Sequence, residues 1–100
     1  CNIENASYGA CICAEQVAIT KAISQITYGR LEFLVLITDT TPAACPCGIC
    51  LQIMNEFAAE NFTVHLANLQ GIQKVIPFKE LMPIGFNRSY IKQESIYERR

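Results

Sequence analysis

Cysteine spacing is the feature of this sequence that points most directly to chemistry. Of the six cysteines in 100 residues, Cys47 and Cys50 form a Cys-x-x-Cys pair at the start of one predicted helix, and Cys13 opens another. Residues three apart on a helix share one face, and the positive end of the helix dipole favours thiolates there. Two helix N-termini that meet would therefore gather three thiolates around one metal ion.

Zinc is the metal that this donor set fits. A catalytic zinc site uses three protein ligands in a tetrahedron and leaves the fourth position to water. Glu15 follows Cys13 by two residues, so its carboxylate would lie close enough to exchange protons with that water. The alternatives are a closed structural zinc site with Cys11 or Cys45 as fourth ligand, buried free thiols, and a redox Cys-x-x-Cys pair. For Cys1, Cys11 and Cys45 themselves we predict small buried side chains.

Two helices and an apolar strand would have to bring these residues together. Apolar residues recur at helical spacing over residues 14–26, and a second helix is predicted over 47–59, with Pro46 just before it. Between them, the apolar run Leu31–Ile37 has the length and the flanks of a buried strand.

The second half of the sequence continues the alternation of helices and strands. We predict strands over 62–66 and 73–76, a turn over 68–71 and a short helical turn over 78–82. Beyond residue 87 the sequence is polar and fits either a terminal helix or a loose tail. This order is typical of an α/β fold with helices packed on a mostly buried sheet.

The composition of the chain limits the kinds of substrate and partner that it can be expected to bind. The net charge is -1 and no basic stripe is present, so we expect a small-molecule substrate and no nucleic acid. No run approaches the roughly 20 apolar residues of a membrane span, and no signal-peptide pattern is visible, so we expect no membrane partner and a cytoplasmic location. With 51% hydrophobic and 17% charged residues, we expect either a missing part of the domain or a covered subunit interface.

The combined motifs resemble a known family. Cys13-Ala14-Glu15 and Pro46-Cys47-Gly48-Ile49-Cys50 together form a three-cysteine version of the zinc deaminase signature, written H-x-E…P-C-x-x-C. With Asn2-Ile3-Glu4-Asn5-Ala6-Ser7-Tyr8-Gly9 before them and Glu80-Leu81-Met82-Pro83 and Phe86 after them, they resemble the small homotetrameric cytidine deaminases. We therefore expect a zinc core over residues 1–86 and a C-terminal tail over 87–100.

The resemblance implies a fold and an activity. The fold would be a three-layer αβα sandwich with a mixed sheet, of which the first helix and strands are missing before residue 1. The activity would be hydrolytic deamination of cytidine and deoxycytidine in pyrimidine salvage, by a cytoplasmic homotetramer that carries Zn²⁺.

The resemblance also implies roles for individual residues. Cys13, Cys47 and Cys50 would hold the zinc, and Glu15 would move the protons. Asn2 and Glu4 would match the Asn-x-Glu pair that binds the ribose. Ala14 would offer a backbone group to the amino group of the substrate, and Phe86 would contact the base at a subunit interface.

Two departures from the family pattern keep other functions open. Arginines commonly occupy the positions of Gln16 and Leu51 and offset the charge of three thiolates, which otherwise makes zinc-bound water less acidic. A non-catalytic zinc-binding subunit with the deaminase fold is therefore an alternative. A blasticidin deaminase is a further one, although those enzymes share the zinc motif without the Asn-x-Glu pair.

Overall fold

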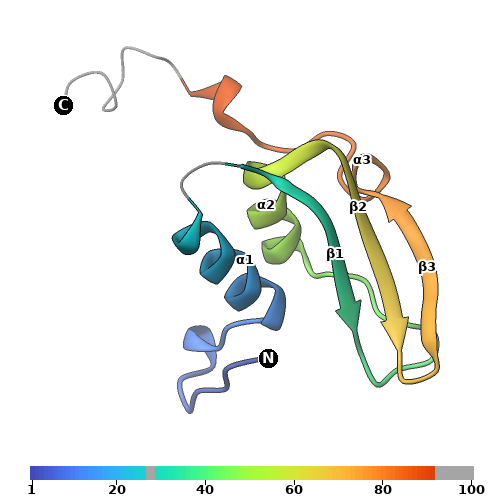
Figure 1. Cartoon of the computed structure of the whole chain (residues 1–100). Coiled ribbons are helices and arrows are strands. Elements are labelled where there is room, and N and C mark those ends of the chain that lie inside the picture. Colours follow the sequence, from blue (N-terminus) through green and yellow to red (C-terminus); the bar gives the residue numbers. More distant parts are fainter. Residues whose placement is uncertain (27–28, 92–100) are drawn as a thin grey trace.

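A mixed three-stranded sheet with two longer helices beside it forms the centre of the molecule (Figure 1). In this computed structural model, residues 1–26 and 29–91 are described. The elements are, in order, η1 (Tyr8–Ala10), α1 (Ala14–Gln25), β1 (Leu31–Ile37), α2 (Gly48–Phe57), β2 (Ala58–Asn68), β3 (Gly71–Pro77), α3 (Phe78–Leu81) and η2 (Arg88–Tyr90).

The first two strands are parallel and are joined through α2. Parallel strands need a crossover connection, and the loop after β1 followed by α2 supplies it before β2 runs beside β1. This arrangement puts the N-terminus of α2 near the carboxyl end of β1. The two cysteines of the Cys-x-x-Cys pair lie at that helix end, so the crossover determines where they sit.

The third strand turns back from the second through a tight connection. Asn68 Oδ1 accepts a hydrogen bond of 2.9 Å from the backbone N–H of Gln70. Gly71 has a φ of 122°, a conformation that glycine adopts readily because it has no Cβ. β3 then pairs antiparallel with β2, so the sheet has the order β1-β2-β3 and is mixed.

The hydrophobic core lies between the sheet and the helices. Successive side chains of a strand point to opposite faces, and one face of each strand contributes to a single buried cluster with α1, α2 and α3. The members of this cluster are Ile19, Leu36, Cys50, Met54, Phe62, Val64, Leu66, Ile76 and Phe78. Cys50 and Met54 are fully buried, so α2 contributes the centre of the core.

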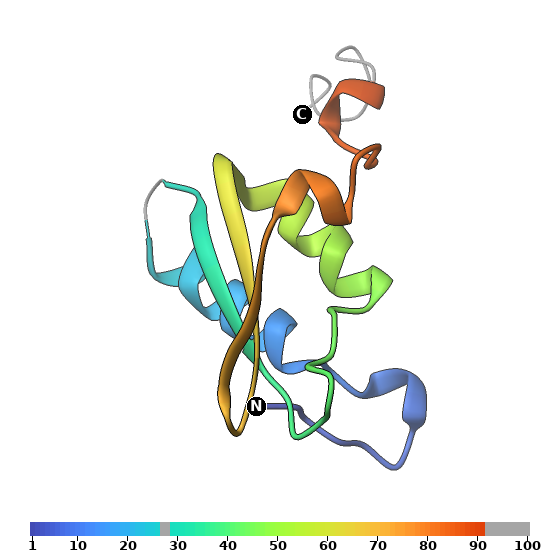
Figure 2. The ribbon, with the colours of Figure 1, turned by 90° about the vertical axis from the view of Figure 1, so that its right-hand side faces the viewer.

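Both longer helices lie on the same side of the sheet (Figures 1 and 2). The opposite face carries exposed apolar side chains, among them Phe33 and Ile37, which are 64% and 63% exposed. The α/β class and the mixed sheet are confirmed, and the described residues form two layers, the sheet and the helices on one of its faces. No helix in residues 1–26 and 29–91 has both the length and the apolar character needed to cross a membrane.

Most predicted elements are present, with differences at their ends. β1 has the predicted bounds, and α1 ends one residue before the predicted residue 26. α2 stops at Phe57 instead of residue 59, because the chain enters β2 directly at Ala58. β2 is longer than the predicted 62–66, because it pairs with a strand on each side. Of the predicted tail, residues 88–90 form η2, and 92–100 lie outside the described residues.

Candidate metal centre

The N-termini of α1 and α2 meet at three cysteines. Cys13 is the N-cap residue of α1, and its carbonyl accepts the first helical hydrogen bond from Val17. Cys47 has the same place in α2, with its carbonyl accepting from Leu51. The sulfur of Cys13 makes no capping hydrogen bond with its own helix. It can therefore turn toward Cys47 and toward Cys50, which lies in the first turn of α2.

The three sulfur atoms have the spacing of a tetrahedral zinc site. The Sγ atoms of Cys13 and Cys47 are 4.0 Å apart, those of Cys47 and Cys50 are 3.6 Å apart, and all three lie within 4.8 Å of one another. Zn–S bonds of about 2.3 Å in a tetrahedron would hold two sulfurs about 3.8 Å apart. The observed distances lie on either side of that value, so the donor set fits zinc.

The three thiols differ in how readily they ionise. A hydrogen bond from the backbone N–H of Cys50 lowers the pKa of Cys47. Burial raises the pKa of Cys50 strongly. Opposing contacts act on the pKa of Cys13. The hydrogen bond with Cys50 lowers it, whereas the bond with Cys47, burial, and the charges of Cys47 and Glu15 raise it, and the net result is a raised pKa. Without a cation, the site therefore favours one thiolate and opposes the second and third.

The metal-binding group found among the described residues has three members and no fourth cysteine, histidine or carboxylate. This is the ligand number of catalytic zinc sites. Cys11 and Cys45, the candidates for a fourth ligand, are exposed and lie outside the group. Our prediction that Cys1, Cys11 and Cys45 are buried is wrong, since their segments run over the surface. Cys11 Sγ instead lies 3.8 Å from Glu4 Oε2.

Glu15 occupies the first turn of α1, two residues after Cys13, and its side chain is half-buried. It borders a hollow of about 230 Å³ between the start of α1 and the carboxyl-terminal half of β1. The residues that line this hollow are Cys1, Ala14, Glu15, Ala18, Leu34, Val35, Leu36 and Ile37. Glu15 thus lies two residues from a candidate metal ligand and lines an open hollow.

The N-terminal segment brings Asn2 and Glu4 toward the same turn. Ile3 and Ile12 form an antiparallel bridge with two backbone hydrogen bonds of 2.9 Å. Asn2 Oδ1 accepts a hydrogen bond of 2.8 Å from the backbone N–H of Ala14. Sequence reasoning gave Asn2 a role toward the substrate and missed this contact with the helix. A polar residue at position 2 does not by itself indicate a hydrogen bond to the start of α1.

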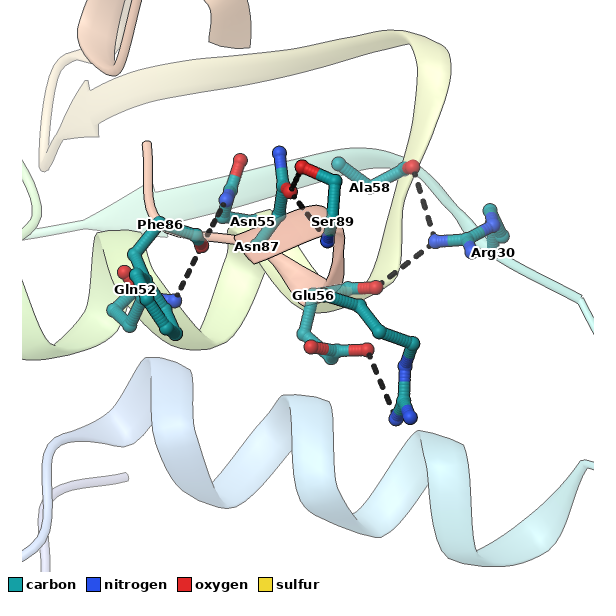
Figure 3. Close-up of polar contacts among 9 residues, drawn as sticks. Arg30, Gln52, Asn55, Glu56, Ala58, Phe86, Asn87 and Ser89 are labelled. Atoms are coloured by element: carbon teal, nitrogen blue, oxygen red, sulfur yellow. Dashed lines mark hydrogen bonds and ion pairs between the residues drawn. The ribbon is translucent and has the colours of Figure 1, made fainter. Parts of the chain in front are cut away.

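Phe86 lies on the outer surface of α2 (Figure 3). Its carbonyl accepts hydrogen bonds of 2.9 Å from Gln52 Nε2 and 2.8 Å from Asn55 Nδ2. Its ring is 58% exposed and stacks on Tyr90, with the ring centroids 5.7 Å apart. The contacts of Phe86 are therefore with α2 and η2, and more than half of its surface is exposed.

The positive potential at the three sulfurs comes from the N-terminal ends of two helices. The two described arginines make their contacts elsewhere. Arg30 donates to the carbonyls of Glu56 and Ala58, and Arg88 pairs with the carboxylate of Glu56 at 3.9 Å (Figure 3). These contacts lie at the C-terminal end of α2, about 15 Å along the helix from its start. Leu51, where the family commonly has an arginine, packs against the hydrophobic core. Two converging helix dipoles remain to favour thiolates.

Comparison with known proteins points to one family. A family model described as the cytidine and deoxycytidylate deaminase zinc-binding region matches residues 1–66. The chain is 42% identical over 87 residues to a cytidine deaminase of Halalkalibacterium halodurans, covering 85% of this chain and 64% of that protein. It is 36% identical over 90 residues to a cytidine deaminase of Mycoplasma pneumoniae, covering 89% and 67%.

A solved structure agrees with this match. The crystal structure of cytidine deaminase from Burkholderia pseudomallei resembles the chain with a TM-score of 0.76 and 38% identity, covering 86% of this chain and 68% of that one. The chain thus spans about two thirds of the length of the relatives it matches. The region matched by the family model contains Glu15 and all three clustered cysteines. The chain therefore belongs to the family of proteins that carry the cytidine and deoxycytidylate deaminase zinc-binding region.

Proposed function

We propose that this chain carries the catalytic site of a zinc-dependent cytidine deaminase, which hydrolyses cytidine or deoxycytidine to the corresponding uridine and ammonia. The observation that carries the proposal is the group of three cysteine sulfurs, with neighbouring sulfurs 3.6 and 4.0 Å apart, at the point where the start of α1, which bears Glu15, meets the start of α2. Cys13, Cys47 and Cys50 would hold the metal. Zinc bound there would lower the pKa of a water molecule and make it nucleophilic near neutral pH.

Glu15 would carry the protons of the reaction. Its carboxylate accepts a proton from the attacking water and delivers it to ring N3, while the water oxygen bonds to C4. It then takes the remaining proton of that oxygen and passes it to the amino group, and the C4–N4 bond breaks to release ammonia. A half-buried carboxylate beside a hollow has both the access to substrate and the shielding that this exchange needs.

The remaining predicted site residues would bind the nucleoside. Asn2 and Glu4 would hold the ribose, supported by the bridge that keeps their segment beside the start of α1. The carbonyl of Ala14 would accept from the substrate amino group, since the N–H of Ala14 is already bonded to Asn2. Phe86 would contact the base bound by a neighbouring subunit, because more than half of its surface is exposed.

Residues 1–86 would form the zinc core of a cytoplasmic homotetramer that works in pyrimidine salvage, with 87–100 as a tail. The support for assembly is the exposed apolar face of the sheet, since large exposed apolar patches commonly mark interaction sites. A net charge of -1 argues for a nucleoside and against a nucleic-acid substrate.

A non-catalytic zinc-binding subunit is the second candidate. The observation that favours it is the place of the two arginines in residues 1–26 and 29–91: Arg30 and Arg88 both contact the C-terminal end of α2, away from the cysteines at its start. Three thiolates and one Zn²⁺ carry a net charge of -1, which makes coordinated water less acidic than neutral ligands would. Such a site could retain metal and lack turnover.

The loss of cytidine absorbance on adding zinc-loaded protein separates the two candidates. The catalytic proposal predicts turnover that disappears on chelation and returns with added zinc. The same preparation is assayed for metal, and Glu15→Ala serves as the matched inactive control. About one zinc per chain without turnover would refute the catalytic proposal for this chain and favour the non-catalytic subunit.

A further inference from the structure

We infer that Asn2 is a positioning residue for the metal centre: by accepting the Ala14 N–H, its side chain fixes the turn that carries Cys13 and Glu15. The structure gives a distance of 2.8 Å between Asn2 Oδ1 and the backbone nitrogen of Ala14. That nitrogen belongs to the residue between the proposed metal ligand and the proposed proton carrier. A role in the orientation of both groups is therefore distinct from the ribose contact proposed above.

The bond fills a specific gap at the start of α1. The first N–H groups of a helix have no partner within the helix, and a side chain of the N-cap residue usually accepts from one of them. Here the N-cap residue is Cys13, and its sulfur makes no capping bond and faces the other two cysteines. Asn2, twelve residues earlier, supplies an oxygen acceptor instead and leaves the sulfur available for a metal.

The backbone around Asn2 makes this acceptor well placed. Ile3, the next residue, is held by two hydrogen bonds of 2.9 Å to Ile12, which directly precedes Cys13. A carboxamide has one acceptor oxygen and one donor NH₂ group. Because the oxygen faces the Ala14 N–H, a flipped amide would place two donors against each other. The orientation is therefore fixed, and the NH₂ group is left as a donor toward any ligand.

Two variants remove the acceptor and the donor of this hydrogen bond, respectively. Asn2→Ala deletes the acceptor. Ala14→Pro deletes the donor at the first helical position, where proline is tolerated, and the extended ψ of 151° at Cys13 suits a residue before proline. We expect each variant to raise the zinc dissociation constant about fivefold, the effect of one ordinary hydrogen bond. The double variant should be no weaker than the single ones, because both changes remove the same bond.

Two further variants provide rescue and a matched control. Asn2→Asp retains an acceptor oxygen, so its zinc affinity should be at least that of the unmodified protein. Asn5→Ala removes a bond of the same kind, from the Ser7 N–H to Asn5 Oδ1 at 2.8 Å, without touching α1. Its zinc affinity should be unchanged. All constants are measured by competition with a chromophoric chelator, with no substrate present.

The inference is tested by comparing the zinc dissociation constants of the five variants with that of the unmodified protein. Unchanged zinc affinity in Asn2→Ala, losses that add in the double variant, or an Asn2→Asp protein as weak as Asn2→Ala would each overturn the inference. A general loss of stability would lower affinity in Asn5→Ala as well and would not be rescued by aspartate. The inference uses the proposed metal ligands but not turnover, so inactive protein with the expected zinc constants would refute only the proposed function.

Discussion

Zinc binding to Cys13, Cys47 and Cys50 should release about two to three protons near neutral pH, because zinc takes thiolate ligands. The pKa of Cys50 is raised by burial, and the net pKa of Cys13 is also raised. Both thiols therefore hold their protons at pH 7 and must lose them when the metal binds. The pKa of Cys47 is lowered by the Cys50 N–H, so this thiol ionises most readily of the three and contributes the smallest share of the released protons.

The proton count sets the size and the sign of the pH dependence. The logarithm of the zinc association constant should rise by about two to three per pH unit between pH 6 and pH 8. This corresponds to about 3 to 4 kcal/mol of binding free energy per pH unit. Affinity increases with pH because the bound form is the deprotonated one, and it continues to increase until the pH passes the two raised pKa values.

Chelator competition at fixed ionic strength, repeated at each pH, measures this slope. Proton release into a weakly buffered solution with an indicator dye gives an independent count. Cys45→Ser is the matched control, since Cys45 is exposed and lies outside the group, and its slope should be unchanged. Cys50→Ser should bind much more weakly and with a smaller slope. A slope near zero in the unmodified protein would refute the three-thiolate site.

Three other variants test the site and the core. Glu15→Ala should retain zinc and lose turnover by about 10²- to 10⁴-fold or more, because it removes the proton carrier; activity near that of the exposed-glutamate control Glu80→Ala would contradict this role. Met54→Ala should lower the free energy of unfolding by about 2 to 5 kcal/mol in urea titrations, since the side chain is fully buried. Leu69→Ala should cost less than about 1 kcal/mol, because that side chain lies in the β2–β3 turn and is 76% exposed; equal losses in the last two would show that the core is misplaced.

The local elements around the site could be predicted because short patterns in the sequence specify them. The apolar run Leu31–Ile37 gave β1 with its observed bounds, and helical spacing gave α1 to within one residue. The ends of β2 were not predictable in this way. Glu60 and Asn61 interrupt its apolar pattern, and its length depends on pairing with both neighbouring strands.

The sequence by itself determined which residue types could hold a metal, since the cysteine spacing and the adjacent Glu15 are local features of two helix starts. Only the tertiary structure decided that Cys13 meets the other two cysteines, that Cys11 and Cys45 stay outside, and that Asn2 bonds to Ala14. The physical reason is that these contacts join segments far apart in the chain. Their geometry is set by the crossover through α2 and by the bridge at Ile3, which no local propensity encodes.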